Sequence, residues 1–409
     1  MPLDRFVKRL SQELAEIEES GTSKGNETVV REIVPSNNGS GPRVLLTGAG
    51  MQPFLRMNSN SYLGMSIRQR VVQAEEEAVR KYGVGPGAVR FISGTFEPHV
   101  RLEERLAKFH GREACMVTSS AYTSIMGLIV TLTTPETIII SDELNHNCII
   151  NAMRLARPKD KKVYQHRNMV DLEFKISDSV GYCDSILIIT DGVFSMRGVY
   201  APLDEISAIV KKYDDSFPRG IVLIVDDSNG VGAIGRTGRG TEEMTGADEV
   251  DIVVATLGKA LGVNGGYIVS KKEVIRYLRE KNPFYIYTNP ITPPEATAAL
   301  AAIDILDSPE GLKLIAHLRH MTERFQQGLV ALGYETIESV HPIVPLMVRD
   351  TSRTSALVTF LREHQILATG INFPIVPKGD QLIRFQVTAD HTEGDINYVL
   401  EVLKKFAQM

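Results

Sequence analysis

Residues 186–190 read ILIIT and residues 221–225 read IVLIV, two almost wholly apolar runs of strand length. Similar runs recur through the middle of the chain, at Ala114–Thr118, Thr137–Ser141 and Ile252–Ala255. Successive runs start about 20 to 50 residues apart, which leaves room for a crossover helix between parallel strands. The pattern therefore predicts an α/β fold with a mostly parallel sheet and helices on both faces.

One step along the chain breaks this spacing. Only about ten residues separate Ala255 from the next apolar run, Gly266–Val269. That distance is too short for a crossover helix, so we expect this one strand to pair antiparallel with its neighbour.

The flanking segments indicate how the rest of the chain is organised. Phe6, Leu10, Leu14 and Ile17 recur at helical spacing and predict an amphipathic helix within residues 1–20. Residues Gly21–Gly50 are rich in Gly, Ser, Asn and Pro and are typical of a long connection. Further helices are expected at Val71–Tyr82, Val100–Phe109, Pro294–Leu306, Leu312–Leu332 and Thr354–His364, and further strands at Ile343–Val348 and Leu382–Val387.

These expectations divide the chain into three parts. Residues 1–55 form an N-terminal helix and a connecting segment, residues 56–292 form a large domain, and residues 293–409 form a smaller α+β domain at the C-terminus.

Composition excludes several classes of protein. The net charge of −5 gives no attraction toward nucleic acid or an anionic membrane. No apolar run approaches the roughly 18 residues that a membrane span needs, and the charged N-terminus does not resemble a signal peptide. The basic run Lys159–Lys162 is short and is expected to be a solvated loop. We therefore expect a cytoplasmic enzyme or binding protein without nucleic-acid or membrane partners.

The three cysteines, Cys115, Cys148 and Cys183, cannot build a disulfide framework and lack zinc-binding spacing. We expect buried thiols and no metal site.

In open α/β sheets, ligands gather at the carboxyl ends of the strands. Ser119–Ser124 follows one strand, and its amide groups could bind a phosphate at a helix N-terminus or simply form a helix cap. Asp226 and Asp227 follow another strand, where a buried acid needs a cation unless it caps the next turn. His146 follows a third strand and is either a functional residue or a histidine held in a structural hydrogen bond. Lys259 lies between glycines after the strand Ile252–Ala255, as a reactive amine or a surface lysine.

Together these features match one cofactor. A phosphate cradle, an aspartate on a core strand and a glycine-flanked lysine are what pyridoxal 5'-phosphate (PLP) requires for its phosphate, its ring nitrogen and its imine bond. Nucleotide-binding and zinc-protease motifs are absent. The sequence therefore predicts a PLP enzyme.

Eight segments, in order, resemble the α-oxoamine synthases, a family of fold-type I PLP-dependent transferases. They are Asn60–Gly64, Gly83–Thr95, His99–Glu103, Ser141–His146, Thr190–Met196, Val225–Ser228, Thr256–Gly262 and Arg384–His391. Within the family, residues 90–95, 373–379 and 388–392 look most like the glycine C-acetyltransferases, also called 2-amino-3-ketobutyrate CoA ligases. The 8-amino-7-oxononanoate synthases, 5-aminolevulinate synthases and serine palmitoyltransferases are the members most easily confused with them.

The resemblance implies a role for each matching position. Lys259 would bind PLP covalently and move the α-proton, His146 would stack on the ring, and Asp226 would pair with the ring nitrogen. Ala121, Tyr122 and Thr256 would bind the PLP phosphate, and Thr288 would contact the PLP phosphate of the neighbouring subunit. Ser195 would bind the phenolic oxygen of PLP. Asn60 and Arg384 would bind the substrate carboxylate. A homodimer with shared active sites follows from the role of Thr288.

Asn229 departs from the family pattern, which usually places a histidine three residues after the ring aspartate. Asparagine can donate a hydrogen bond, including one to the phenolic oxygen of PLP, but cannot transfer a proton at neutral pH. Asn229 therefore stands among the candidate catalytic and cofactor-binding residues with an altered function.

The resemblance implies an acyltransferase that condenses an amino acid, glycine in our expectation, with an acyl-CoA thioester to give an α-amino ketone or a 2-amino-3-oxoacid. Because Asn229 replaces histidine, a different PLP reaction on the same scaffold, such as transamination, racemisation or aldol cleavage, is the alternative. A non-catalytic paralogue that binds a partner is a third possibility, against which the retained Lys259, Asp226, His146 and Arg384 argue.

Overall fold

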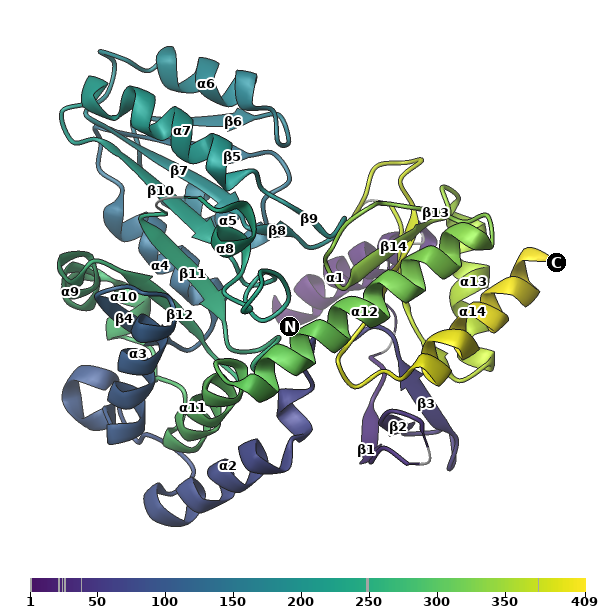
Figure 1. Ribbon diagram of the computed structural model, residues 1–409. Helices are drawn as coiled ribbons and strands as arrows, with labels where there is room; N and C mark the ends of the chain where they lie inside the picture. The colour runs from purple at the N-terminus through teal and green to yellow at the C-terminus, as the bar shows by residue number, and fades with distance from the viewer. Residues whose placement is uncertain are drawn as a thin grey trace.

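The computed structural model describes residues 2–20, 23, 25, 27–37, 39–247, 250–373 and 375–409. It has a large layered body and a smaller lobe, joined by a long helix that runs from one to the other (Figure 1). Pro374, which belongs to one of the segments that resemble the glycine C-acetyltransferases, lies outside the described residues.

The large body is built on a sheet of seven strands in the order β4-β12-β11-β10-β7-β5-β6. β12 pairs antiparallel with both of its neighbours, while the other pairs, β11 with β10, β10 with β7, β7 with β5 and β5 with β6, are parallel. The predicted sheet and its one antiparallel strand are confirmed. The strands are β4 (Ala114–Thr118), β5 (Thr137–Asp142), β6 (Asp160–Tyr164), β7 (Ser185–Asp191), β10 (Ile221–Asp226), β11 (Ile252–Thr256) and β12 (Gly266–Ser270).

Both faces of this sheet are covered, which explains why its strands are apolar throughout. Side chains alternate along a strand, so Ile186 and Ile188 of β7 enter one buried cluster while Leu187 and Ile189 enter the other. One face is covered by α3 (Glu97–Phe109), α6 (Met169–Ser177), α7 (Leu203–Tyr213) and α11 (Pro293–Leu306). The other is covered by α4 (Ala121–Leu132), α5 (Asn147–Leu155), α9 (Lys272–Lys281) and α10 (Pro283–Ile286).

The smaller lobe contains a second sheet, in the order β13-β14-β17-β16, against which helices pack. All of its pairs are antiparallel, which confirms the α+β character expected of the C-terminal part. Its strands are β13 (Glu335–Thr336), β14 (Ile343–Met347), β16 (Thr369–Ile371) and β17 (Leu382–Gln386), and its helices are α12 (Pro309–Ala331), α13 (Thr351–Glu363) and α14 (Glu393–Ala407).

The predicted connection Gly21–Gly50 is wrong in part, because it contains two strands. β1 (Val30–Val34) and β2 (Arg43–Leu46) form a sheet with β3 (Pro53–Arg56), and β3 pairs in parallel with β15 (Ile366–Leu367). β1 is almost wholly exposed, so it lacks the apolar run that marks a buried strand. Through β15, this N-terminal segment joins the smaller lobe.

The expected loop at Lys159–Lys162 is also wrong in part. Residues 160–162 belong to β6, the edge strand of the large sheet. Lysines on an edge strand keep it from pairing with another chain, so their charge is compatible with a strand as well as with a loop.

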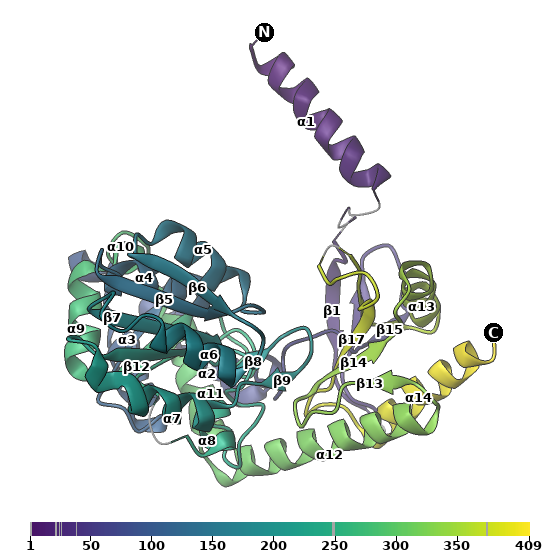
Figure 2. The same ribbon diagram turned by 90° about the horizontal axis from the view of Figure 1, so that it is seen from above.

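The first helix, α1 (Pro2–Glu19), confirms the amphipathic helix expected from the sequence. It projects away from the rest of the chain (Figure 2), and its apolar side chains Leu3, Phe6, Leu10 and Leu14 are exposed. The domain boundaries at residues 55 and 292 stay predictions. No helix in the described ranges is long and apolar enough to cross a membrane.

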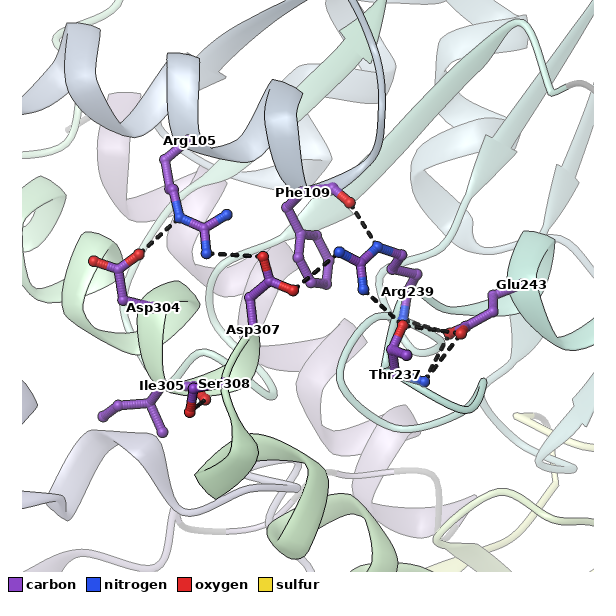
Figure 3. A network of polar contacts seen from close by, with 9 residues as sticks. All are labelled: Arg105, Phe109, Thr237, Arg239, Glu243, Asp304, Ile305, Asp307 and Ser308. Atoms are coloured by element: carbon purple, nitrogen blue, oxygen red, sulfur yellow. Dashed lines mark hydrogen bonds and ion pairs between the residues drawn. The ribbon is translucent and has the colours of Figure 1, made fainter.

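A cluster of charged side chains fixes the point where α11 ends and α12 begins (Figure 3). Arg105 donates to Asp304 at 2.7 Å and to Asp307 at 3.0 Å, and Arg239 donates to the other oxygen of Asp307 at 2.9 Å. Because α12 carries the smaller lobe, this junction holds the base of the lobe against the large body.

Candidate active site

The two aspartates at the end of β10 have different surroundings. Asp227 accepts hydrogen bonds from the backbone N–H and the hydroxyl of Thr241, at 2.7 and 2.6 Å, and burial raises the pKa of Asp227 to about 6. A Cβ on Gly240 would lie 1.9 Å from this carboxylate, so the loop closes tightly around it. Asp227 is thus the acid that ties down the turn. Asp226 accepts from the Ser228 N–H at 3.1 Å and lies near Lys259 and His146. Burial lowers the pKa values of Lys259 and His146, and the charge of Asp226 partly opposes that shift.

Lys259 lies in the short link between β11 and β12. The link is closed by backbone hydrogen bonds between Leu257 and Gly265 (2.9 Å) and between Val263 and Leu257 (3.0 Å). Lys259 Nζ donates to Asn229 Oδ1 at 2.8 Å. Burial lowers the pKa of Lys259, partly offset by the carboxylates of Asp226 and Asp191. This lysine is therefore held inside the site rather than in solvent.

Asn229 is the centre of the polar contacts around the lysine. Its Oδ1 also accepts from the hydroxyl of the fully buried Tyr62 at 3.0 Å, and its Nδ2 donates to the Val193 carbonyl at 3.3 Å. Its own carbonyl lies 2.8 Å from Nε2 of His341. Burial lowers the pKa of His341 to about 3, so this histidine is neutral and donates that hydrogen bond. The backbone and the side chain of Asn229 are both held in place.

His146 is the N-cap of α5. Its Nδ1 accepts the Cys148 N–H at 3.2 Å, and its own N–H donates to Asp191 Oδ2 at 3.1 Å. The residue is exposed, and the ring meets Tyr122 edge-on at 6.3 Å between centroids. Burial of the imidazole nonetheless lowers the pKa of His146. The ring is a neutral surface on which an aromatic ligand can stack.

Asp191 pairs in register with Asp226 on the adjacent strand. Burial and the charge of Asp226 raise the pKa of Asp191 well above its ordinary value.

The N-terminus of α4 can accept an anion. Ser120 caps the helix by accepting from Thr123 N at 3.1 Å, whereas the amides of Ala121 and Tyr122 have no partner in the described part of the chain. A Cβ on Gly266 would lie 2.2 Å from Ala121 N, so a glycine lets β12 pass close to the start of the helix. Unpaired amides at a helix start can bind a phosphate.

Thr256, the predicted third phosphate ligand, donates its hydroxyl to the Gly265 carbonyl at 3.1 Å. That hydroxyl would have to turn in order to contact a phosphate.

The smaller lobe supplies Arg384, on β17. Its Nε donates to the Ser195 carbonyl at 2.6 Å, and its Nη2 donates to Asn60 Oδ1 at 3.3 Å. Gln386 donates to the same Asn60 oxygen at 2.7 Å. Burial lowers the pKa of Arg384, and no ion pair to it occurs among the described residues. A half-buried guanidinium without a carboxylate can bind a carboxylate ligand.

Most of the predicted residues are joined by contacts. A series of hydrogen bonds runs from Lys259 through Asn229 and Tyr62 to Asn60 and Arg384. Within it, Tyr62 Oη lies 3.4 Å from Asn60 Oδ1. Ser195 lies in the turn between β8 (Val193–Phe194) and β9 (Val199–Tyr200), and its carbonyl joins the same series of hydrogen bonds by accepting from Arg384.

Thr288 is half-buried in the segment between α10 and α11, and no contact joins it to the other predicted site residues of its own chain in the described part. Its predicted role toward a neighbouring subunit remains a prediction.

Sequence reasoning missed four side chains at this site. Tyr62, His341, Gln386 and Cys148 all contact predicted residues. Tyr62 and Gln386 lie within quoted family segments, which was the available signal. His341 is far along the chain from the residue that it contacts, and no local pattern marks it.

A cavity of about 620 Å³ opens beside His146 and Ser195. Part of its wall is apolar, formed by Met196, Met347, Ile375, Val376 and Leu382. Charged side chains also line it, and Arg197 pairs with Asp380 at 3.2 Å. The described residues contain no cluster of three or more His, Cys, Asp or Glu side chains suited to a metal ion.

Comparison with known proteins gives a consistent result. The sequence model of the aminotransferase class I and II family matches residues 52–403. The 8-amino-7-oxononanoate synthase of Thermosipho melanesiensis is 41% identical over 352 residues, which are 86% of this chain and 88% of that protein. The 8-amino-7-oxononanoate synthase 1 of Bacillus subtilis is 40% identical over 87% of this chain and 89% of its own.

Solved structures agree. Serine palmitoyltransferase from Sphingomonas wittichii superposes with a TM-score of 0.86 at 26% identity, over 99% of this chain and 98% of its own. A serine palmitoyltransferase structure with PLP bound also has a TM-score of 0.86 at 26% identity, over 98% of this chain and 96% of its own.

Proposed function

Because the chain belongs to the α-oxoamine synthases, PLP-dependent acyltransferases of the aminotransferase class I and II family, we propose that it condenses a small amino acid with an acyl-CoA thioester. Glycine as the amino acid is part of the proposal, and so is the glycine C-acetyltransferase-like specificity. The relatives reported above carry a different name, that of synthases of 8-amino-7-oxononanoate, an α-amino ketone. The substrate screen described below therefore varies both the amino acid and the thioester.

The residues present fit PLP. The unpaired amides of Ala121 and Tyr122 suit its phosphate, and the Asp226 carboxylate suits its ring nitrogen. The exposed face of His146 suits the ring, Ser195 and Asn229 would hold the phenolic oxygen, and Lys259 would be the covalent attachment. When bound, PLP supplies a sink for the electron pair left behind as the amino acid loses its α-proton.

Lys259 is the base in this proposal. Its lowered pKa increases the fraction of neutral amine near neutral pH, which is the form that accepts a proton. Asn229 Oδ1 accepts from Nζ at 2.8 Å, and this contact fixes the position of the amine. The shared acceptor links Lys259 to Tyr62, so the lysine is also oriented by a fully buried ring.

Arg384 and Asn60 hold the amino acid by its carboxylate. The guanidinium is fixed by the Ser195 carbonyl, and the Asn60 oxygen is fixed by Gln386. A carboxylate at Arg384 would supply the negative charge that its surroundings lack. The observation that carries the proposal is this guanidinium without an ion-pair partner among the described residues, which is linked to Lys259 by the series of hydrogen bonds through Asn60, Tyr62 and Asn229.

The acyl thioester would enter through the cavity beside His146 and Ser195. Its apolar side chains suit an acyl chain, and its volume of about 620 Å³ exceeds what an acetyl group alone would fill. In the condensation a bond forms between the α-carbon of the amino acid and the acyl carbon, the C–S bond breaks, and the free thiol is released. Loss of carbon dioxide afterwards would give an α-amino ketone.

We further propose a homodimer that shares its active sites through Thr288. The preceding residue, Tyr287, is 78% exposed, so its ring is available for contact with a second chain.

Asn229 favours a second candidate, a different PLP reaction on amino acids. Its Oδ1 accepts from both Lys259 and Tyr62, so an amide rather than an acid occupies the usual histidine position. An amide cannot protonate an acyl oxygen, and a reaction without an acyl thioester would not need it to do so.

A substrate screen separates the two candidates. The purified PLP-bound enzyme is mixed with each of a series of amino acids and acyl-CoA thioesters of increasing chain length, and free thiol is measured. Thiol release that requires both substrates supports the condensation. Turnover of the amino acid without any thioester, and no thiol release with one, would refute it in favour of the second candidate.

A further inference from the structure

Cys148 lies between two groups of the candidate cofactor site. It is in the first turn of α5 and is 2% exposed. Its sulfur is 3.7 Å from Asp226 Oδ2, on the neighbouring sheet, and 2.9 Å from Nδ1 of His146. One small side chain thus touches both the carboxylate assigned to the ring nitrogen and the histidine assigned to the ring face.

The thiol has a single proton and two possible acceptors. Nδ1 of His146 already accepts the backbone N–H of Cys148 at 3.2 Å, so its lone pair is engaged and the ring proton is on Nε2. Asp226 Oδ2 has no other protein donor among the described residues, whereas Oδ1 accepts the Ser228 N–H. A carboxylate is also a stronger acceptor than a neutral imidazole. The thiol proton therefore points to Asp226.

Burial and the nearby carboxylates of Asp226 and Asp191 raise the pKa of Cys148. The side chain remains a neutral thiol, and it can act as a donor but not as a nucleophile. A thiol is a weak donor, so it orients the Asp226 side chain and leaves its oxygens able to accept a further hydrogen bond.

We propose that Cys148 is a positioning residue of the cofactor site, whose thiol donates to the Asp226 carboxylate while its sulfur packs against the His146 ring. It thereby sets the distance between the group that pairs with the PLP nitrogen and the group that stacks on the PLP ring. The inference rests on the proposed roles of Asp226 and His146.

Two substitutions separate a donor from a filler of space. Cys148→Ser keeps a hydrogen-bond donor and Cys148→Ala removes it, while the two side chains are of similar size. Cys183→Ser is the matched control, because Cys183 is also buried but precedes the start of β7, at the opposite end of the strand from Asp191. The dissociation constant for PLP is measured by titrating each cofactor-free chain and following the absorbance of bound PLP.

We expect Cys148→Ala to raise this constant about threefold to fivefold, in line with one lost hydrogen bond. Cys148→Ser should stay within about twofold of the original chain, because the donor is kept, and Cys183→Ser should show no change. If serine is as harmful as alanine, or more so, Cys148 only fills space, and the proposal is overturned. The same holds if Cys148→Ala binds PLP as tightly as the original chain.

A double-mutant cycle tests the partner. Asp226→Ala alone should weaken PLP binding about tenfold, and adding Cys148→Ala to it should have no further effect, because the acceptor is gone. If the two substitutions weaken PLP binding additively, the proposed role of Cys148 is refuted, while that of Asp226 stands. If Asp226→Ala leaves PLP binding unchanged, the proposed role of Asp226 fails, and the inference falls with it.

Discussion

Arg105 and Arg239, at the α11–α12 junction, each have a carboxylate within hydrogen-bonding distance, whereas Arg384 in the candidate active site forms no ion pair among the described residues. Lys259 differs from Arg384, because it donates to an amide oxygen but has the acids Asp226 and Asp191 close by. The two regions use the same kinds of side chain, and they differ in whether the protein itself balances the charge. A balanced cluster stabilises a joint. An unbalanced cluster costs stability on its own and is completed by a ligand of the missing charge.

The largest effect should come from removing the lysine. In the proposed function Lys259 is both the covalent attachment of PLP and the base, so turnover of Lys259→Ala should fall by several orders of magnitude. Borohydride treatment followed by mass spectrometry should find no PLP fixed to the variant. If PLP is still fixed to the chain, another lysine is the attachment site.

Asp226→Asn should be next. Without the negative charge the ring nitrogen loses its proton, and the rate of α-proton exchange should fall about 10²–10³-fold. The affinity for PLP should fall only about tenfold, because the phosphate contacts at Ala121 and Tyr122 remain. Exchange is followed by NMR in deuterated water. A near-normal rate would show that Asp226 is structural.

Arg384→Ala tests the unbalanced cation directly. Loss of the charge-assisted contact should raise the KM for the amino acid by the equivalent of about 2–4 kcal/mol, with PLP binding unchanged. Steady-state kinetics with a saturating thioester measures the change. An unchanged KM in a folded variant would exclude Arg384 from the substrate site.

Asn229→His restores the residue usual in the family. An imidazole can transfer a proton, so the acyl-transfer step should change by about tenfold, while α-proton exchange changes less. Because Asn229 Oδ1 serves both Lys259 and Tyr62, a histidine can accept from only one of them. Both rates are measured with the same amino acid and acyl-CoA. Equal changes in the two steps would mean that Asn229 does not discriminate between them.

The smallest effect is expected at the balanced junction. Asp307→Ala removes the shared partner of Arg105 and Arg239 and should cost about 1 kcal/mol of unfolding free energy. Urea denaturation measures this loss, and kcat and KM per folded molecule should not change. Glu13→Ala, at an exposed pair with Arg9, is the control that should cost almost nothing. A changed KM in Asp307→Ala would mean that the remaining pair of Arg105 with Asp304 does not keep the junction rigid.

The sequence was sufficient for the large sheet because its strands are buried on both faces and therefore form continuous apolar runs, as in β7 and β10. It was insufficient for β1, whose side chains face solvent and follow no buried pattern. The lysines of β6 suit a loop or an edge strand equally well.

At the site, position along the strands identified Lys259, Asp226 and His146, since the carboxyl ends of parallel strands meet at one edge. The strand pattern alone did not separate Asp226 from Asp227, and the family resemblance chose Asp226. The structure shows that Thr241 ties down Asp227. Contacts such as Asn229 with His341 join remote positions, and no spacing along the chain predicts them.

Helix α12 has 23 residues and so a length of about 34 Å. It is fixed at one end by the Asp307 cluster and carries the lobe that contains Arg384, while Lys259 belongs to the other body (Figures 1 and 2). It therefore has the mechanics of a lever: a tilt of a few degrees at the fixed end displaces the far end by a few ångströms. That displacement is comparable to the length of a hydrogen bond, so the two halves of the site stay aligned only while this remote joint is rigid. The pair of Arg105 with Asp304 remains at the joint even when Asp307 is replaced.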